Sequence, residues 1–320
     1  MMSFDGNMDG AIKGRKFSHP LWTARGEARA VVALRALRTL WLNTGTVCNS
    51  ACVTCCMGSR PRNDRLAFLT PEDLVPFLEE MEAHPVLAPG EIGLTGGEPF
   101  VNPHITPLLT LCLERGFRVL VLTNALKPMS HRREDLARLR ERHGARLALR
   151  VSLDHYGVGA HEALRGSGTF AAALDGLTRL ARHGFTASVA GRMVGPESET
   201  ERRQGFAALF ARYDIPIAAE DPEALVLFPE MDLTRDVPEI TTACWGVLHK
   251  SPDSVMCAWS RMIVHRQGEA GPAVVACTLL PYDPAFELGH TLADAARPVS
   301  LNHPYCAQFC VLGGGACSQG

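Results

Sequence analysis

Three closely spaced cysteines, Cys48, Cys52 and Cys55, are the residues of this sequence best suited to carry chemistry. Thiolates at this spacing can face a common centre from one loop, and thiolates are the usual ligands of iron–sulfur clusters. Three cysteine ligands on a [4Fe-4S] cluster leave the fourth iron free to bind a small molecule. A second run, Gly96 to Pro99, reads Gly-Gly-Glu-Pro and is the expected partner of the cysteine loop.

The elements that must position these residues are strands and helices that alternate along the chain. Mostly apolar runs predict strands, and apolar residues at spacings of three and four predict helices. The expected strands are 40–43, 91–95, 117–123, 147–153, 185–192 and 225–228. The expected helices are a short one at 27–37, one that begins at Thr70 and Pro71 and is kinked or delayed by Pro76, and those at 105–115, 133–143, 170–182 and 199–213.

The expected strands are apolar along their length, as in a sheet covered on both faces, and the helices between them imply parallel pairing. Polar residues fall just after successive strands, namely Cys48, Glu98, Asn124, Asp154 and Arg192. Functional residues at the carboxyl ends of strands are typical of barrel enzymes, although a doubly wound open sheet has the same periodicity. We therefore predict an α/β fold, with a partial (β/α)6 TIM-like barrel at 38–230 after a lead-in at 1–37.

The composition bounds the class of protein. The 320 residues are 46% hydrophobic, enough for a large core, and a formal charge of −2 with a pI near 6.6 gives no reason to expect a nucleic-acid or anionic-membrane partner. No apolar run is long enough to span a membrane, and residues 1–16 lack the core of a secretory signal, which predicts a cytoplasmic protein. Eleven cysteines are unusual there, and metal binding explains them better than disulfides do.

The Cys48-x-x-x-Cys52-x-x-Cys55 motif after a first strand, with Gly-Gly-Glu-Pro ending the second, resembles the radical S-adenosylmethionine (radical SAM) superfamily. The resemblance covers about residues 40 to 229. It implies reductive cleavage of SAM at a [4Fe-4S] cluster to a 5′-deoxyadenosyl radical, which takes a hydrogen atom from a substrate. Thr54 departs from the pattern, because members often carry an aromatic residue there beside the adenine; this concerns the adenine contact and not the cluster.

The resemblance assigns a role to each motif residue. Cys48, Cys52 and Cys55 hold the cluster, and the glycines let backbone groups approach SAM closely. Ser152 and Asp154 lie on one face of a strand and suit the ribose or the polar end of SAM. A guanidinium pairs well with the SAM carboxylate, although a structural ion pair or turn is the alternative for Arg192 and Asn124. The expected cofactor-binding residues are Gly96, Gly97, Glu98, Pro99, Asn124, Ser152, Asp154 and Arg192.

After Pro229 the alternation stops and cysteines become frequent, in a segment too small to rely on its own hydrophobic core. The pattern resembles the SPASM or twitch extension, which implies a small Cys-rich domain at 231–320 with a second, auxiliary [4Fe-4S] cluster. Its expected ligands are Cys257, Cys277, Cys306 and Cys310, with Cys317 as the replacement for one of them. Four-cysteine zinc is the alternative, and the roles of Cys56 and Cys244 stay open between a hydrogen-atom donor and a small hydrophobe.

Fewer than fifty residues precede Cys48, which favours a small-molecule substrate or a short peptide delivered by a separate protein. An external electron donor such as flavodoxin or ferredoxin is expected to reduce the cluster. Oxidation, epimerisation and bond formation all remain open as outcomes. The alternatives are radical transfer of the aminocarboxypropyl group of SAM, a non-enzymatic iron–sulfur electron carrier, and a zinc-bound scaffold.

Overall fold

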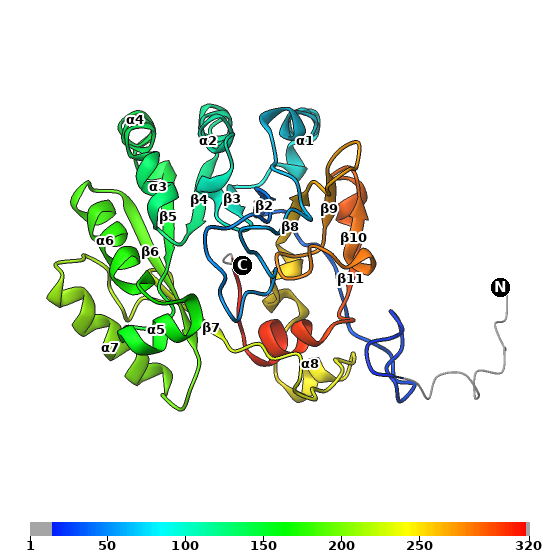
Figure 1. Ribbon diagram of the computed structural model, residues 1–320. Coiled ribbons are helices and arrows are strands. Elements are labelled where there is room, and N and C mark those ends of the chain that lie inside the picture. Colours follow the sequence, from blue (N-terminus) through cyan, green and yellow to red (C-terminus); the bar gives the residue numbers. More distant parts are fainter. Residues whose placement is uncertain (1–14, 318–320) are drawn as a thin grey trace.

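The fold is built on a curved nine-stranded sheet (Figure 1). The computed structural model describes residues 15–317, so the first part of the expected lead-in, residues 1–14, lies outside the described residues. The strand order is β10-β9-β8-β2-β3-β4-β5-β6-β7, and the run from β8 to β7 is parallel throughout. The strands of this sheet are β2 Thr39–Asn43, β3 Glu91–Thr95, β4 Arg118–Thr123, β5 Leu147–Ser152, β6 Thr186–Met193, β7 Leu225–Pro229, β8 Ser260–Val264, β9 Ala273–Val275 and β10 Glu287–Gly289.

Helices cover the outer side of the sheet, and the segment that ends at Cys317 lies within its curve (Figure 1). Leu74, Phe77 and Leu78 of the first helix show the pattern, because these buried residues recur at helical spacing. The helices are α1 Pro71–Ala83, α2 Ile105–Glu114, α3 Lys127–His131, α4 Arg133–His143, α5 Val158–Arg165, α6 Thr169–Arg182, α7 Glu199–Arg212 and α8 Cys244–Val247. The predicted α/β, partial-barrel architecture is confirmed.

Two local expectations were wrong. Residues 27–37 form no helix; instead β1 Val31–Val32 pairs antiparallel with β11 Val299–Ser300, so pairing with a distant segment overrides local helical spacing. Pro76 does not delay the start of α1, which runs from the capping box of Thr70 to Ala83 with the proline inside it, and the expected alternative, a kink at Pro76, stays a prediction. The short helices α3 and α5 were not expected at all.

The residues after 230 do more than carry cysteines. β8 pairs parallel with β2, and β9 and β10 extend the same sheet, so this segment adds strands to the barrel. Met262, Ile263 and Val274 are fully buried and belong to the same hydrophobic core as the barrel strands. The segment therefore shares the hydrophobic core of the barrel instead of having one of its own, while the expected metal staple stays a prediction. The boundary at 230 stays a prediction.

Candidate active site

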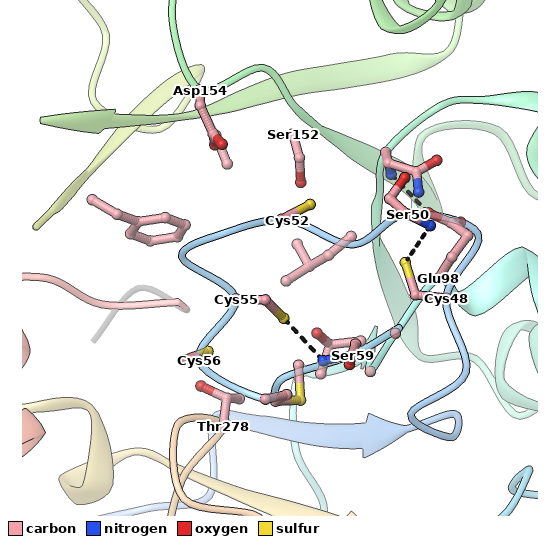
Figure 2. A pocket seen from close by; sticks show the side chains of 18 of the residues that line it. Cys48, Ser50, Cys52, Cys55, Cys56, Ser59, Glu98, Ser152, Asp154 and Thr278 are labelled. Atoms are coloured by element: carbon pink, nitrogen blue, oxygen red, sulfur yellow. Dashed lines mark hydrogen bonds between the residues drawn. The ribbon is translucent and has the colours of Figure 1, made fainter. Parts of the chain in front are cut away.

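Three thiols line one cavity at the carboxyl ends of the strands. Cys48, Cys52 and Cys55 come from the loop after β2, which curls round the cavity with Ser152 and Asp154 on one side (Figure 2). The backbone N–H of Ser50 donates to Cys48 Sγ at 3.4 Å, and that of Ser59 donates to Cys55 Sγ at 3.3 Å. Such bonds favour the thiolate, the form that binds metal.

The electrostatics of these thiols fit a metal cluster as their partner. Burial raises the pKa of Cys48 to about 12, and it also raises the pKa of Cys52, against which Arg165 acts. Thiols so buried stay protonated unless a metal ion supplies positive charge. Within residues 15–317, no three His, Cys, Asp or Glu side chains converge as a single metal ion requires. Cysteine thiolates are the usual protein ligands of a [4Fe-4S] cluster, so the three thiols of the loop are a donor set that fits a cluster.

The Gly-Gly-Glu-Pro run fixes the cysteine loop to the end of β3. The Gly97 N–H donates to the Gly45 carbonyl at 2.8 Å, and the Glu98 N–H donates to the Val47 carbonyl at 3.2 Å. A Cβ on Gly97 would lie 2.1 Å from that Val47 oxygen, so only glycine fits. The glycines therefore allow the cysteine loop to pack closely against the end of β3. Gly96, Gly97 and Glu98 line the cavity, whereas Pro99 begins a buried turn beside it.

Glu98 joins the ends of two strands beneath the cavity. Its carboxylate accepts hydrogen bonds from Thr123 Oγ1 and the Asn124 N–H, both at 2.8 Å, and from the Phe100 N–H at 3.2 Å. Burial raises its pKa to about 7, although these three donors oppose the shift. Asn124 also lines the cavity and donates from Nδ2 to Asn49 of the cysteine loop at 2.8 Å.

Asp154 is the centre of an ion-pair group on the opposite wall. Arg165 donates to both of its oxygens, at 2.7 and 3.0 Å, while Arg192 Nε lies 3.5 Å from Oδ1. Burial alone would raise the pKa of Asp154, but the two guanidiniums hold it below its ordinary value. Arg192 also donates to the Thr54 carbonyl at 3.1 Å, beside the third cysteine. Ser152, Asp154 and both arginines line the same cavity as the three thiols.

Arg165 was missed by the sequence analysis. It is the last residue of α5, a helix that the alternating pattern did not predict, and it lines the cavity facing Cys52. The available signal was Gly166, which follows Arg165 with φ +99° and ends the helix. Recognising that a helix ends at Gly166 would have placed Arg165, eleven residues after Asp154, beside the end of β5.

A second group of thiols lies apart from the cavity. Cys257, Cys277, Cys306 and Cys310 do not line it, but charges on these neighbours act together with burial to raise the pKa values of Cys306 and Cys310. Cys257 and Cys306 belong to the hydrophobic core and Cys277 and Cys310 pack against it, so the four thiols share one part of the segment after 230, while their role as cluster ligands stays a prediction. Their shared surroundings suit a metal cluster for the same reason as in the cysteine loop.

The remaining cysteines fall into two pairs, one that lines the cavity and one that does not. Cys56 and Cys317 line the same cavity as the three loop thiols, and Cys317 Sγ lies 3.2 Å from Thr278 Oγ1. Cys244 accepts a hydrogen bond from the Thr241 N–H at 3.3 Å and does not line that cavity. Cys112 is fully buried in α2. Cys244 and Cys112 therefore have structural surroundings, whereas Cys56 and Cys317 face the site.

Comparison with known proteins agrees with this geometry. The family model for the Radical SAM superfamily matches residues 42–209, just over half of the chain. Mycofactocin maturase MftC of Mycobacterium ulcerans is 30% identical over 173 residues, and that of Mycolicibacterium smegmatis is 29% identical over 167 residues. Each match covers 52% of this chain but only 42% and 40% of the respective relative, so the chain spans about two fifths of their length.

Solved structures share the fold at low sequence identity. SuiB of Streptococcus suis, solved with S-adenosylmethionine bound, has a TM-score of 0.57 at 13% identity and covers 79% of this chain and 63% of its own. anSMEcpe, solved with bound AdoMet, has a TM-score of 0.55 at 14% identity, with 79% and 74% covered. No helix in residues 15–317 is long and apolar enough to cross a membrane. With the family match across the cysteine loop and the strand ends, the chain belongs to the Radical SAM superfamily, whose members are enzymes that use a [4Fe-4S] cluster and SAM.

Proposed function

We propose that this enzyme modifies a peptide and that the cavity described above is its active site. The observation that carries the proposal is the meeting of three thiols from one loop with polar residues from the ends of β3, β4, β5 and β6 in a single cavity. A loop with three cysteines, or a buried ion pair, would by itself be an ordinary structural feature. Their convergence on the end of the barrel where functional residues gather is what supports an active site.

The cofactor ligands follow from this arrangement. Cys48, Cys52 and Cys55 would hold the [4Fe-4S] cluster, and Gly96, Gly97, Glu98, Asn124, Ser152, Asp154 and Arg192 would hold SAM, with Pro99 fixing the turn beside it. When bound, the cluster and SAM supply a radical that removes a hydrogen atom from the substrate. Arg165 joins this set, because it orients the Asp154 carboxylate and presents positive charge to the loop.

The protein residues around the cavity orient the ligands and exclude water. Phe228, Met231 and Phe309 form an apolar wall, on which the rings of Phe228 and Phe309 lie 5.5 Å apart. Apolar walls keep water and side reactions away from a reactive species. This wall carries no charge and suits an apolar side chain of the substrate.

An auxiliary [4Fe-4S] cluster is proposed on Cys257, Cys277, Cys306 and Cys310, with Cys317 as the replacement for one of them. Support comes from the proximity of these thiols, since the charges of these neighbours, with burial, raise the pKa values of Cys306 and Cys310. The auxiliary cluster would assist electron transfer, and an external donor such as flavodoxin or ferredoxin would reduce the enzyme. Oxidation, epimerisation and bond formation remain open as the outcome.

A peptide is the substrate class that the relatives favour over a small molecule. MftC is named as a maturase, and SuiB has been solved bound to its precursor peptide SuiA. The shared fold covers most of this chain, and the apolar wall fits a side chain presented by a peptide. A short precursor peptide is therefore the first substrate to test.

The test is SAM cleavage by the anaerobically reconstituted protein. The wild type should release 5′-deoxyadenosine with dithionite, and the variant Cys48→Ala/Cys52→Ala/Cys55→Ala should release none. Cys112→Ala is the matched control, since this buried thiol lies in α2 away from the cavity, and it should cleave SAM at the wild-type rate. Cleavage by the triple variant would refute the assignment.

The substrate class is tested separately. Precursor peptides encoded beside the gene should raise the release of 5′-deoxyadenosine and gain or lose mass. If only small molecules stimulate cleavage and are changed, the peptide assignment is wrong while the cofactor assignment stands.

A further inference from the structure

The amino ends of the barrel strands surround a second cavity, of about 710 Å³, which we call the lower cavity. Along β5, Ala148 and Arg150 line it, whereas Ser152, two residues further on, lines the proposed active site. β6 repeats this division, with Ser188 in the lower cavity and Ala190 in the active site. Alternate residues of a strand point to the same face, so these side chains form two inward columns. The lower cavity is therefore a space inside the barrel, at the opposite end of the strands from the active site.

Small side chains leave this space inside the barrel. The interior of a barrel of parallel strands is normally filled by bulky branched side chains. Here the lining includes the small residues Thr39, Ala148 and Ser188, while Leu37 and Leu120 add apolar surface. A volume of about 710 Å³ lies within the range of small-molecule sites. The lower cavity therefore has room for an organic ligand with an apolar part.

Arg150 lies deep in the lower cavity, because it is the fourth residue of β5. The residue is 9% exposed, so its guanidinium is largely removed from solvent. Nε donates to Ser188 Oγ at 3.1 Å, and Nη1 donates to the carbonyl oxygen of Cys317 at 3.0 Å. Its third nitrogen, Nη2, has no hydrogen-bond partner within residues 15–317 and is not fully enclosed by protein atoms. One donor group of a buried cation is therefore open to the cavity.

The charges at the mouth of the lower cavity do not neutralise Arg150. The mouth carries three guanidiniums and three carboxylates, which stand shortly before the strands or at their first residues: Arg38, Arg118, Arg146, Glu91, Asp221 and Glu223. Arg118 pairs with Glu91 at 3.3 Å, whereas Arg150 belongs to no ion pair in the part of the chain that the structure describes. A buried cation without a carboxylate partner is costly. An anion held deep in the cavity would offset that cost.

We propose that the lower cavity binds a small organic anion, with its carboxylate or phosphate group against Arg150 Nη2 and the Ser188 hydroxyl. Ser188 Oγ accepts a hydrogen bond from Arg150, so its own O–H remains available to donate. Guanidinium and hydroxyl donors suit the oxygens of either group. Leu37 and Leu120 supply apolar surface for the rest of the ligand. The site lies apart from the proposed active site and does not depend on the proposed function.

Isothermal titration calorimetry on the anaerobically reconstituted full chain tests the site with three probes of similar shape, benzoate, phenyl phosphate and benzyl alcohol. At least one of the two anions should bind, and the uncharged alcohol should bind at least about tenfold more weakly, because it makes no charge-assisted hydrogen bond to Arg150. Tighter binding of benzoate would identify a carboxylate as the ligand group, and tighter binding of phenyl phosphate would identify a phosphate. Equal binding of all three probes, or binding of none, would overturn the proposal.

Two variants place the bound anion in the lower cavity. Arg150→Met removes the cation and should weaken binding of the anion at least about tenfold. Ala148→Phe keeps Arg150 but fills the cavity, so it should weaken binding as well, and it decides the question alone if Arg150→Met does not fold.

The matched control for Arg150→Met is Arg192→Met. Arg192 lines the active-site cavity instead, so this variant should bind the anion within about twofold of the wild type, because screening weakens the effect of a distant charge. Binding that is lost in Arg192→Met but kept in Arg150→Met would place the anion in the active site. That result, or undiminished binding in Ala148→Phe, would overturn the proposal.

Discussion

The two groups of thiols differ in what surrounds them. The cysteine loop faces a cavity lined by two carboxylates, hydroxyls and two guanidiniums. In contrast, Cys257 and Cys306 are buried in the core, Cys277 and Cys310 pack against it, and none of these four lines that cavity. A cluster in the first setting has room and polar partners for a small molecule. The second group has mostly apolar neighbours, together with the buried Arg261, which donates to the Cys257 carbonyl. The comparison teaches that two groups of thiols, both proposed to bind clusters, differ in their surroundings, and that these surroundings favour substrate chemistry for the first group and support for the second.

The largest expected effect concerns metal content, which tests whether the second group binds a cluster of its own. The variant Cys48→Ala/Cys52→Ala/Cys55→Ala should retain about four irons and four sulfides per chain. Adding Cys306→Ala should remove them, as measured by iron and sulfide analysis. Cys244→Ala in the same background is the control and should leave the iron in place, because Cys244 only accepts a bond from Thr241. Zinc without sulfide in the triple variant would mean a structural zinc site instead.

The polar wall of the first group should be sensitive to loss of its buried ion pair. Arg165→Met leaves the buried Asp154 carboxylate without its main partner and should lower the free energy of unfolding by about 3 to 5 kcal/mol in urea titrations. Arg192→Met should cost less, since its Nε lies 3.5 Å from Asp154. Combining Asp154→Asn with Arg165→Met should restore part of the loss. Equal effects of the two arginine variants would contradict the roles given to them.

Glu98 gives the first group a pH dependence between about pH 4.5 and 7, whereas the raised pKa values of Cys306 and Cys310 in the second group lie in the alkaline range. Its pKa is about 7 in the folded protein against 4.5 ordinarily, so the folded state holds the proton more tightly between these values. Without SAM, the free energy of unfolding should therefore fall as pH rises from about 4.5 to 7, by up to about 3 kcal/mol. Glu98→Gln should flatten this part of the profile in denaturant titrations at several pH values. An unchanged slope would show that Glu98 is not its source.

The smallest expected effect separates Cys56 from its neighbour Cys55. Cys56→Ala should leave the iron content unchanged and SAM cleavage within about twofold of the wild type, as for a small hydrophobic residue. Cys55→Ala, one residue away, should lose the loop cluster. A loss of iron in Cys56→Ala would show that Cys56 is a cluster ligand and contradict the assignment of Cys48, Cys52 and Cys55 as the loop ligands.

The parts of the fold with local signals were predictable. The apolar strand runs and the cap at Thr70 lie where the sequence pattern placed them, because periodicity and capping are properties of neighbouring residues. Residues 27–37 were misassigned because their partners, around Val299 and Ser300, are remote in sequence. Local spacing also could not show that Cys317 enters the barrel or that β8 pairs with β2.

The candidate site was predictable to the extent that its residues follow strands. The three thiols, Glu98 and Asp154 stand at strand ends, so a parallel sheet brings them together without further information. Arg165 lies at the end of a short helix, and its contact with Asp154 depends on how that helix returns to the sheet. The tight fit of Gly97 to the Val47 carbonyl likewise depends on tertiary contact.

The pairing of β8 with β2 has a consequence for how the chain folds during synthesis. Thr39 and Ser260 are neighbours in the sheet but lie about 220 residues apart in sequence. While the ribosome makes the intervening residues, β2 can pair with β3 on one side, but its other edge has no strand to bond. Exposed strand edges invite association with other chains, and such late, non-local pairing slows folding. The first strand of the barrel therefore stays vulnerable to aggregation until the last quarter of the protein has emerged.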